Sequence, residues 1–279
     1  QDDLRWDRGH DRLERHGETR QAFTDLADAW DAARDAAKVQ ADRLLLDHKA
    51  GTLDAEAVAS RWTQSLRANS ASAFTSSPLL TETTARSLAS KSSRLVNLGK
   101  NTPISDTDLR VQLVTGLLAG FYTFVRDKFA PPDPDHASAA WWFLREMCYG
   151  SMFRFNKEGR FNIPYGGASY NRKDLRAKAE ILLSPKTQQI FASARIECLD
   201  FRDFFASYGQ GRSDDFIFLD PPYDTEFSDY GNNAFGQADQ RALAAMIGQL
   251  RSQVMLVIKN TDFIRDLYLE IAADDDRFT

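Results

Sequence analysis

The stretch Phe216-Ile217-Phe218-Leu219-Asp220-Pro221-Pro222-Tyr223 decides how this chain is interpreted. Its first four residues form a continuous apolar run, which is typical of a β-strand covered on both faces in a parallel sheet. The two prolines fix φ and lack backbone N–H donors, so they close the strand with a rigid turn. The sequence therefore predicts a buried strand that carries a polar turn at its carboxyl end.

The flanking sequence predicts the rest of this sheet. Residues 195–199 are expected to form a short strand, and residues 254–258 a second buried strand. Residues 236–252 predict a helix with one apolar face, made by Leu243, Met246, Ile247 and Leu250. Strands that alternate with helices indicate a doubly wound, Rossmann-like α/β sheet with parallel pairing. Ligands of such sheets bind beyond the carboxyl ends of the strands, where the chain places Asp200, Asp220 and Asn260.

The turn at residues 220–223 suits chemistry at an amino group. The exocyclic amine of a nucleobase is a poor nucleophile because its lone pair is delocalised into the ring. The carboxylate of Asp220 and the carbonyl of Pro221 are two acceptors that can hold the amine hydrogens and direct the lone pair at a methyl donor. Tyr223 offers a flat ring on which a base taken out of a duplex can stack. The alternative is a simple tight turn with Asp220 as a cap.

Composition limits where nucleic acid could bind. The 279 residues are 43% hydrophobic and 27% charged, enough for one large α/β domain with an insertion or for two domains. A net charge of −5 excludes a polybasic protein, so a nucleic-acid surface must be local. We expect Cys148 and Cys198 to be core residues in a reducing compartment. The four histidines are scattered along the sequence, so we expect no metal site.

No targeting or membrane segment is expected. Residues 1–12 are rich in charge and have no apolar core. The longest apolar stretch, residues 113–125, includes two Thr and two Gly and is shorter than the roughly 20 residues of a membrane span. The expected location is therefore cytoplasmic.

The first half of the chain predicts helices. Residues 1–60 are charged, with Phe23, Leu26, Ala27 and Trp30 spaced along one helical face. Residues 68–110 are rich in Ser, Thr and Asn and predict loops and short helices. Residues 111–129 predict a helix stopped by two prolines, and residues 139–149 a second apolar helix. Residues 1–110 show no catalytic pattern and are interpreted as a helical region of unknown role.

A basic stretch lies between these helices and the predicted sheet. Residues 154–178 hold seven basic and two acidic residues, a local charge of +5. Aromatic residues and glycines are interleaved with them, which suits contacts to phosphates and bases in a DNA groove. The alternative is a solvated run of charge.

Three ordered matches make residues 121–262 resemble the Dam-type adenine-specific DNA methyltransferases. Residues 121–129 are similar to the helix before the family's DNA-recognition region. Residues 149–166, which end in Phe161-Asn162-Ile163-Pro164-Tyr165-Gly166, are similar to a stretch that ends in Phe-Asn-Val-Pro-Phe-Gly. Residues 220–223 match the catalytic motif, and the aromatic spacing that follows it is matched by Phe227, Tyr230 and Phe235.

The resemblance implies S-adenosylmethionine as methyl donor and double-stranded DNA as partner, with adenine flipped into the site. It implies a catalytic turn formed by Asp220, Pro221, Pro222 and Tyr223, and donor contacts from Asp200, Phe201 and Asp220. The residues expected to approach DNA or the target pocket are Arg154, Asn156, Lys157, Arg160, Asn162, Tyr165, Arg172 and Lys173.

One family feature is absent from this sequence. The family binds its donor through a Phe-x-Gly-x-Gly turn preceded by a Gly-Gly-Lys segment, and neither precedes Phe121. Residues 116–120 and 97–100 only partly resemble them. Three alternatives stay open: a partner chain that supplies the donor half, a segment outside these residues, or a degenerate methylase that binds DNA without catalysis. Because the chain stops before the last strands that such a sheet normally has, we expect a missing piece.

These observations predict an α/β methyltransferase fold with a helical DNA-recognition region and an extra N-terminal helical segment. The expected boundaries are 1–110, 111–185 for target recognition and 186–279 for the catalytic part. The expected function is site-specific methylation of the exocyclic amine of adenine in DNA, in restriction-modification or phage defence. A pseudo-methylase that binds DNA and partners is the competing hypothesis, and methylation of the cytosine amine is a third.

Overall fold

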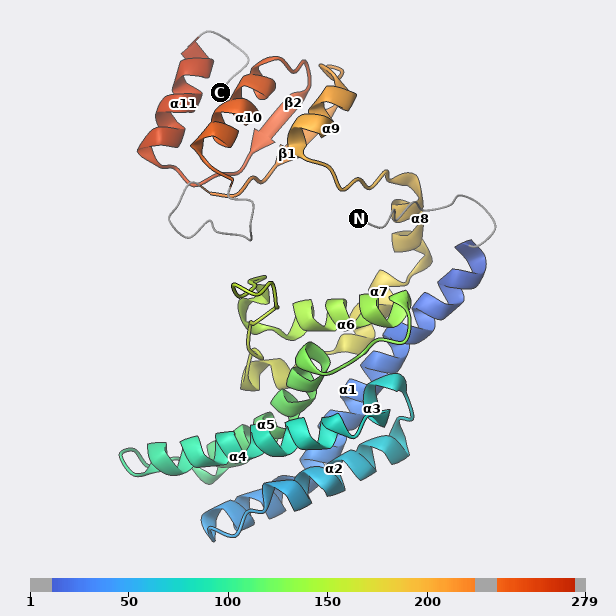
Figure 1. Cartoon of the computed structure of the whole chain (residues 1–279), viewed down its shortest axis with the longest axis vertical. Coiled ribbons are helices and arrows are strands. Elements are labelled where there is room, and N and C mark those ends of the chain that lie inside the picture. The colour runs from blue at the N-terminus through green and yellow to red at the C-terminus, as the bar shows by residue number, and fades with distance from the viewer. Residues whose placement is uncertain (1–11, 224–234, 274–279) are drawn as a thin grey trace. The chain divides into compact units, whose positions relative to one another are not determined.

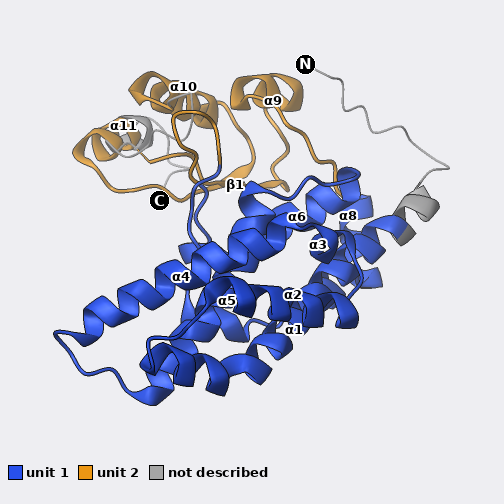
Figure 2. Cartoon of the chain, turned by 60° about the horizontal axis from the view of Figure 1, so that its bottom comes forward, with its two compact units in different colours: residues 1–153, 161–193 blue, residues 154–160, 194–279 orange. Residues whose placement is uncertain are grey.

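Helices build the first of two separate units in the computed structural model, which describes residues 12–223 and 235–273. Unit 1 comprises residues 1–153 and 161–193, and unit 2 comprises residues 154–160 and 194–279 (Figure 2). Each unit has its own cluster of buried apolar side chains. The two units are therefore described one at a time.

Eight α-helices and two 3₁₀ turns form the described part of unit 1 (Figure 1). Their bounds are α1 Arg12–Lys49, α2 Ala55–Asn69, α3 Ala73–Ser76, α4 Leu79–Gly99, α5 Asp106–Asp127, α6 Pro134–Met147, η1 Tyr149–Ser151, η2 Ala168–Arg172, α7 Leu175–Leu182 and α8 Pro185–Ser193.

The core of unit 1 is aromatic and joins α1, α5 and α6. Trp30 lies 5.9 Å from Phe121 and 5.5 Å from Phe143 between ring centroids, and all three side chains are fully buried. The predicted apolar face of α1 is confirmed, because Phe23, Leu26, Ala27 and Trp30 are all buried. The first helical segment is therefore an integral part of this core.

Helix α5 is the element around which unit 1 packs. It contacts α1, α4 and α6, and it begins at the cap Ser105, whose hydroxyl accepts a hydrogen bond from the Asp108 N–H at 3.1 Å. The predicted helix at residues 111–129 is confirmed, with a start five residues earlier. The predicted helix at residues 139–149 is confirmed as α6, which also starts earlier because Asp133 caps it and Pro134 opens it.

We predicted loops and short helices over residues 68–110. This was wrong for residues 79–99, which form the 21-residue helix α4. Ser and Thr are weak helix formers, but Leu80, Thr84 and Leu88 lie on one buried face. That face packs on α5, where a Cβ on Gly120 would lie 2.5 Å from the Thr84 Cα. Tertiary packing thus overrides local propensity.

Unit 2 is a small α/β layer. Its elements are α9 Phe201–Tyr208, β1 Phe216–Leu219, α10 Gln237–Gly248, β2 Gln253–Leu256 and α11 Asp262–Ala273. Strands β1 and β2 pair in parallel, with Phe216 opposite Gln253 and Leu219 opposite Leu256. Helix α10 lies between them in sequence (Figure 1). The predicted strand–helix–strand order with parallel pairing is confirmed.

The sheet is covered on one face only, so the prediction of strands buried on both faces was wrong. Ile217, Leu219 and Val254 pack against the cluster that includes Leu243 and Ile247 of α10. On the opposite face, the exposed fractions are 63% for Phe216, 57% for Phe218 and 53% for Met255. No described element of unit 2 covers these three side chains.

The predicted strand at residues 195–199 is absent. The segment is irregular, and Ile196 and Leu199 are exposed. A strand exists only where its backbone groups pair with a neighbour, and none of the described residues pairs with this segment. Cys198 is exposed, against prediction, whereas Cys148 is buried as predicted.

The described chain is therefore helix-rich with a small parallel sheet. A complete doubly wound sheet stays a prediction. None of the described helices is long and apolar enough to cross a membrane.

Candidate active site

The predicted catalytic turn begins directly after β1. Asp220 follows Leu219, the last residue of the strand, and its side chain is exposed. Tyr223 is 43% exposed, while Pro221 and Pro222 are half-buried. The two prolines thus pack against the rest of unit 2, whereas Asp220 and Tyr223 are accessible to a ligand.

A buried amide from α10 holds this turn. The Nε2 of Gln240 donates a hydrogen bond of 2.9 Å to the Pro222 carbonyl oxygen. Gln240 is fully buried. The Pro222 carbonyl is therefore engaged, and Asp220 and the Pro221 carbonyl carry the acceptors on which the predicted grip on an amine depends.

Asp200 caps the first turn of α9. One of its carboxylate oxygens accepts a hydrogen bond of 2.9 Å from the Arg202 N–H and lies 3.4 Å from the Arg202 guanidinium. The side chain is 52% exposed, so it can also accept hydrogen bonds from a ligand. Phe201 lies 5.5 Å from Phe235 between ring centroids, with the Arg202 guanidinium over its face. Phe227 and Tyr230 of the predicted aromatic spacing lie outside the described residues.

Arg202 connects α9 to α10. Its guanidinium also forms an ion pair with Asp239, which accepts a hydrogen bond of 2.8 Å from the Gly236 N–H at the start of α10. The hydrogen bond from Arg202 holds the pKa of Asp239 below its ordinary value. Since Asp239 precedes Gln240, a continuous set of contacts leads from Asp200 to the predicted catalytic turn.

The predicted DNA-binding residues are divided between the two units. Residues 154–160 belong to unit 2 and form a turn in which the Asn156 side-chain oxygen accepts hydrogen bonds from the backbone N–H groups of Glu158 and Arg160. Gly159 has a φ of +73°, which this turn requires. Arg154, Lys157 and Arg160 are exposed. Asn156 thus shapes the turn that presents basic side chains.

The remaining predicted DNA residues lie in unit 1, where two of them face inward. Tyr165 donates a hydrogen bond of 2.8 Å to Asn171, and burial raises its pKa. Lys173 donates to the Glu146 carbonyl and lies 3.9 Å over the Tyr170 ring, and burial lowers its pKa. Asn162 is partly buried, and Arg172 is exposed. Their contact with DNA stays a prediction.

Part of the predicted basic surplus is neutralised within unit 1. Arg176 pairs with Asp28 on α1, and Lys178 pairs with Glu146 on α6 at 2.5 Å. These two cations join helices to one another. The charge open to phosphates is therefore smaller than the sequence count indicates.

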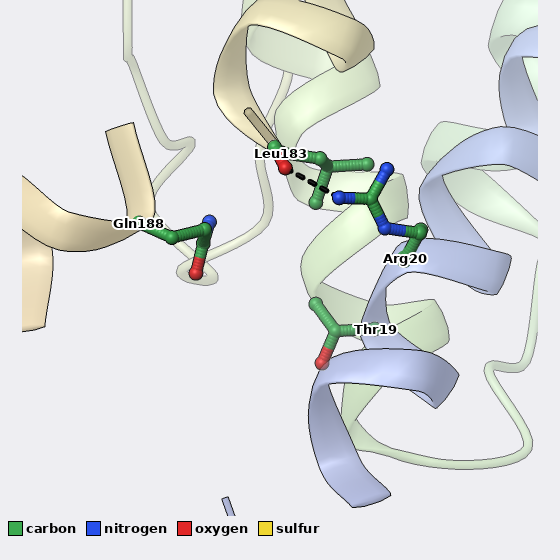
Figure 3. Close-up of a pocket in the computed structure, with 4 residues that line it drawn as sticks. All are labelled: Thr19, Arg20, Leu183 and Gln188. Carbon is green, nitrogen blue, oxygen red and sulfur yellow. Dashed lines mark hydrogen bonds between the residues drawn. The ribbon is translucent and has the colours of Figure 1, made fainter. Parts of the chain in front are cut away.

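A small pocket in unit 1 lies between α1, the residue after α7 and helix α8. Thr19, Arg20, Leu183 and Gln188 line it, and the Arg20 guanidinium donates a hydrogen bond of 2.5 Å to the Leu183 carbonyl (Figure 3). None of the predicted site residues lines this pocket. Among the described residues, no group of three or more His, Cys, Asp or Glu side chains is arranged to hold a metal ion.

Sequence reasoning did not identify Arg202, Asp239 or Gln240. For Gln240 a signal existed, because it occupies the apolar face of α10 three, four and seven residues before Leu243, Ala244 and Ile247. A polar residue at such a position indicates a buried hydrogen bond. Arg202 and Asp239 leave no comparable pattern, since their pairing depends on how α9 packs beside α10.

A parallel strand that ends in an accessible Asp-Pro-Pro-Tyr turn fits the class of methyltransferases that act on amino groups. Comparison with known proteins agrees: residues 115–276 match the D12 class N6 adenine-specific DNA methyltransferase family. The match covers more than half of the chain, and the chain belongs to this family. The resemblance to Dam-type enzymes is thereby confirmed.

Curated relatives carry related names. The chain is 34% identical over 139 residues to the type II methyltransferase M.CviBI of Paramecium bursaria Chlorella virus NC1A, covering 50% of each protein. It is 33% identical over 132 residues to the retron Ec67 DNA adenine methylase of Escherichia coli, covering 45% of this chain and 42% of that protein. It is 30% identical over 160 residues to the DNA adenine methylase of Haemophilus influenzae, covering 53% and 52%. The chain thus spans about half the length of the curated relatives it matches.

Proposed function

We propose that this chain is a site-specific DNA adenine methyltransferase, or its catalytic subunit, in restriction-modification or phage defence. It would transfer a methyl group from S-adenosylmethionine to the exocyclic amine of adenine. The observation that carries this proposal is the rigid turn at the carboxyl end of β1, which leaves Asp220 and Tyr223 accessible in a chain of this family. Names of the relatives support the same chemistry.

The turn would act by positioning. Asp220 and the Pro221 carbonyl would accept the two hydrogens of the adenine amine and hold its lone pair toward the incoming methyl group. Tyr223 would stack on the base after it leaves the duplex. The amine loses one proton when the new N–C bond forms and the methyl–sulfur bond of the donor breaks, and the Asp220 carboxylate would be an acceptor for that proton.

S-adenosylmethionine would supply an electrophilic methyl group on a sulfonium centre. Asp200, Phe201 and Asp220 would form part of its site, because Asp200 keeps an exposed carboxylate at the start of α9. The described residues fit this role only in part. Gly116 and Gly120 lie inside α5 and pack on α4, so they provide no turn that could approach a donor.

We further propose that the sheet of unit 2 is half of a doubly wound sheet. Parallel sheets are covered on both faces in known folds, and an isolated pair of strands is marginal. The exposed side chains of Phe216, Phe218 and Met255 support an additional layer that covers them. A partner chain or a further segment that completes the donor site would provide that layer.

Double-stranded DNA would bind through the recognition region, residues 111–185. Arg154, Lys157, Arg160 and Arg172 support this assignment because their side chains are exposed. Residues 1–110 would support that region through the shared helical core, and residues 186–279 would carry the chemistry.

Two measurements test the proposed function. Calorimetric titration with S-adenosylmethionine asks whether the donor site is complete, and micromolar binding is expected if it is. Transfer of a radiolabelled methyl group to unmethylated genomic DNA, followed by mass spectrometry of the nucleosides, is expected to yield N6-methyladenine. DNA binding without transfer would favour the degenerate methylase instead, and N4-methylcytosine would assign the activity to cytosine.

A further inference from the structure

Gln240 is a buried amide on the apolar face of α10, and it contacts the catalytic turn. Along the helix, Gln240 follows the exposed first residues of α10 and precedes the apolar residues Leu243 and Ala244. Its side chain is fully buried. Its Nε2 donates 2.9 Å to the Pro222 carbonyl, 18 residues earlier in the chain. This hydrogen bond connects the backbone of the turn to a side chain of helix α10.

The bond fixes the orientation of one peptide group. The Pro222 carbonyl and the Tyr223 N–H belong to the same planar peptide unit, so holding the oxygen also sets the direction in which Tyr223 leaves the turn. Pro221 and Pro222 already have fixed φ angles. Their ψ angles stay free, and the Gln240 bond removes that freedom at Pro222.

Resting on the proposed function, we propose that Gln240 is a positioning residue for methyl transfer. It acts through the Pro222–Tyr223 peptide and holds the Tyr223 ring and the neighbouring Asp220 in the geometry that receives the target base. It touches neither the base nor the methyl donor.

Two further observations favour this role over simple packing. The Oε1 of Gln240 is buried and accepts no hydrogen bond from the described residues. An unpaired buried oxygen is unfavourable for folding, so an apolar side chain would suit this position better if stability alone mattered. The Arg202–Asp239 ion pair also anchors the start of α10 to α9, which keeps Gln240 in place.

Replacement of the amide tests the proposal. Gln240→Leu removes the donor and fits the apolar surroundings, so the melting temperature is expected to stay unchanged or to rise. The kcat for DNA methylation should fall by about tenfold to a hundredfold because the reacting group is misplaced, while KM for DNA changes much less. Gln237→Leu, at an exposed glutamine at the start of the same helix, is the matched control and should keep wild-type kcat.

A glutamate at the same position adds a pH readout. Gln240→Glu has nearly the same shape, but only its protonated form can donate to the Pro222 carbonyl. Burial favours that neutral form, so the kcat of this variant relative to wild type should rise as the pH is lowered from about 8 to about 6. A role in packing alone predicts that kcat recovers only in step with the melting temperature of this variant, so thermal denaturation is measured at the same pH values.

Nuclear magnetic resonance tests the bond without requiring activity. The backbone amide of Tyr223 belongs to the peptide that Gln240 holds, so its resonance should shift and its order parameter should fall in Gln240→Leu relative to wild type and to Gln237→Leu. An unchanged kcat in Gln240→Leu, or an unchanged Tyr223 amide, would overturn the proposal. If wild-type protein transfers no methyl group, the proposed function fails, whereas the Tyr223 amide still decides whether Gln240 orients the turn.

Discussion

At the scale of single residues, Asp220 combines a fixed backbone with an accessible carboxylate. It lies between the paired strand β1 and two prolines, so its main chain has little freedom, yet its side chain is exposed. This combination suits a group that must meet a reacting amine in one geometry. A carboxylate that served only as a turn cap would instead be bonded to the backbone that follows it.

We predict that Asp220→Ala reduces methyl transfer by a hundredfold to a thousandfold or more, because loss of one preorganised charged contact in a transition state has roughly this effect. DNA affinity, measured by fluorescence anisotropy, should change little. Asp214→Ala removes an exposed carboxylate just before β1, where it pairs with Arg212, and serves as the control. Substantial turnover by Asp220→Ala would exclude the proposed mechanism.

At the scale of elements, the contact between α4 and α5 depends on glycine. A Cβ on Gly120 would lie 2.5 Å from the Thr84 Cα and 2.9 Å from its Oγ1, too close for any side chain. The nearest of these atoms, the Thr84 Cα, is backbone, so it cannot move aside without shifting a helix.

We predict that Gly120→Ala destabilises the protein by about 1–3 kcal/mol through overpacking. Chemical denaturation of unit 1, followed by circular dichroism, measures the change. Gly99 near the end of α4 has nothing within 4 Å of an added Cβ, so Gly99→Ala should be neutral or stabilise the helix by up to about 1 kcal/mol. Equal effects of the two substitutions would show that close helix contact is not the cause.

The junction of α9 and α10 should depend on pH. Asp239 has a lowered pKa because Arg202 donates to its carboxylate. A carboxyl group with a lowered pKa in the folded state stabilises the protein above its ordinary, unfolded pKa. That contribution disappears as the pH falls through the lowered value.

We predict that Asp239→Asn lowers the melting temperature of unit 2 at pH 7 and has a smaller effect at pH 3. Asparagine can still accept the hydrogen bond from the Gly236 N–H, so the substitution isolates the loss of charge. The measurement is thermal denaturation across this pH range. Asp266→Asn, at an exposed position in α11, is the control. A pH-independent effect of Asp239→Asn would contradict the assigned cause.

At the scale of the whole molecule, the two units have hydrophobic cores of unequal size. Unit 1 buries a large aromatic core that includes Trp30, Phe121 and Phe143, whereas the cluster in unit 2 centres on four buried residues. Small cores give small stability. Unit 2, which carries the candidate active site, also exposes an apolar sheet face.

We therefore predict two unfolding transitions, with unit 2 unfolding first. Differential scanning calorimetry should resolve them, and Gly120→Ala should shift only the later one. A single transition with equal calorimetric and van't Hoff enthalpies would show that the units unfold together. A ligand or partner that covers Phe216 and Phe218 should raise the earlier transition.

The amino-acid sequence by itself determined the elements with strong local signals. The apolar run before Asp220 predicted β1, and the apolar face with Leu243 and Ile247 predicted α10. The two prolines predicted the turn, which lies within the part of the chain that matches the family. Each of these depends on neighbours within one helical or strand period. The α1, α5 and α6 helices were predictable for the same reason.

Only the tertiary structure decided which segments pair, which faces are buried and which charged side chains are engaged within the protein. Residues 195–199 have a strand-like composition but no strand partner among the described residues. Ser- and Thr-rich α4 is helical because Gly120 lets it pack closely on α5. The inward position of Lys173 and the bond from Gln240 to the Pro222 carbonyl join residues far apart in the chain. Pairing, burial and such long-range hydrogen bonds depend on distances in space, and sequence spacing does not encode those distances directly.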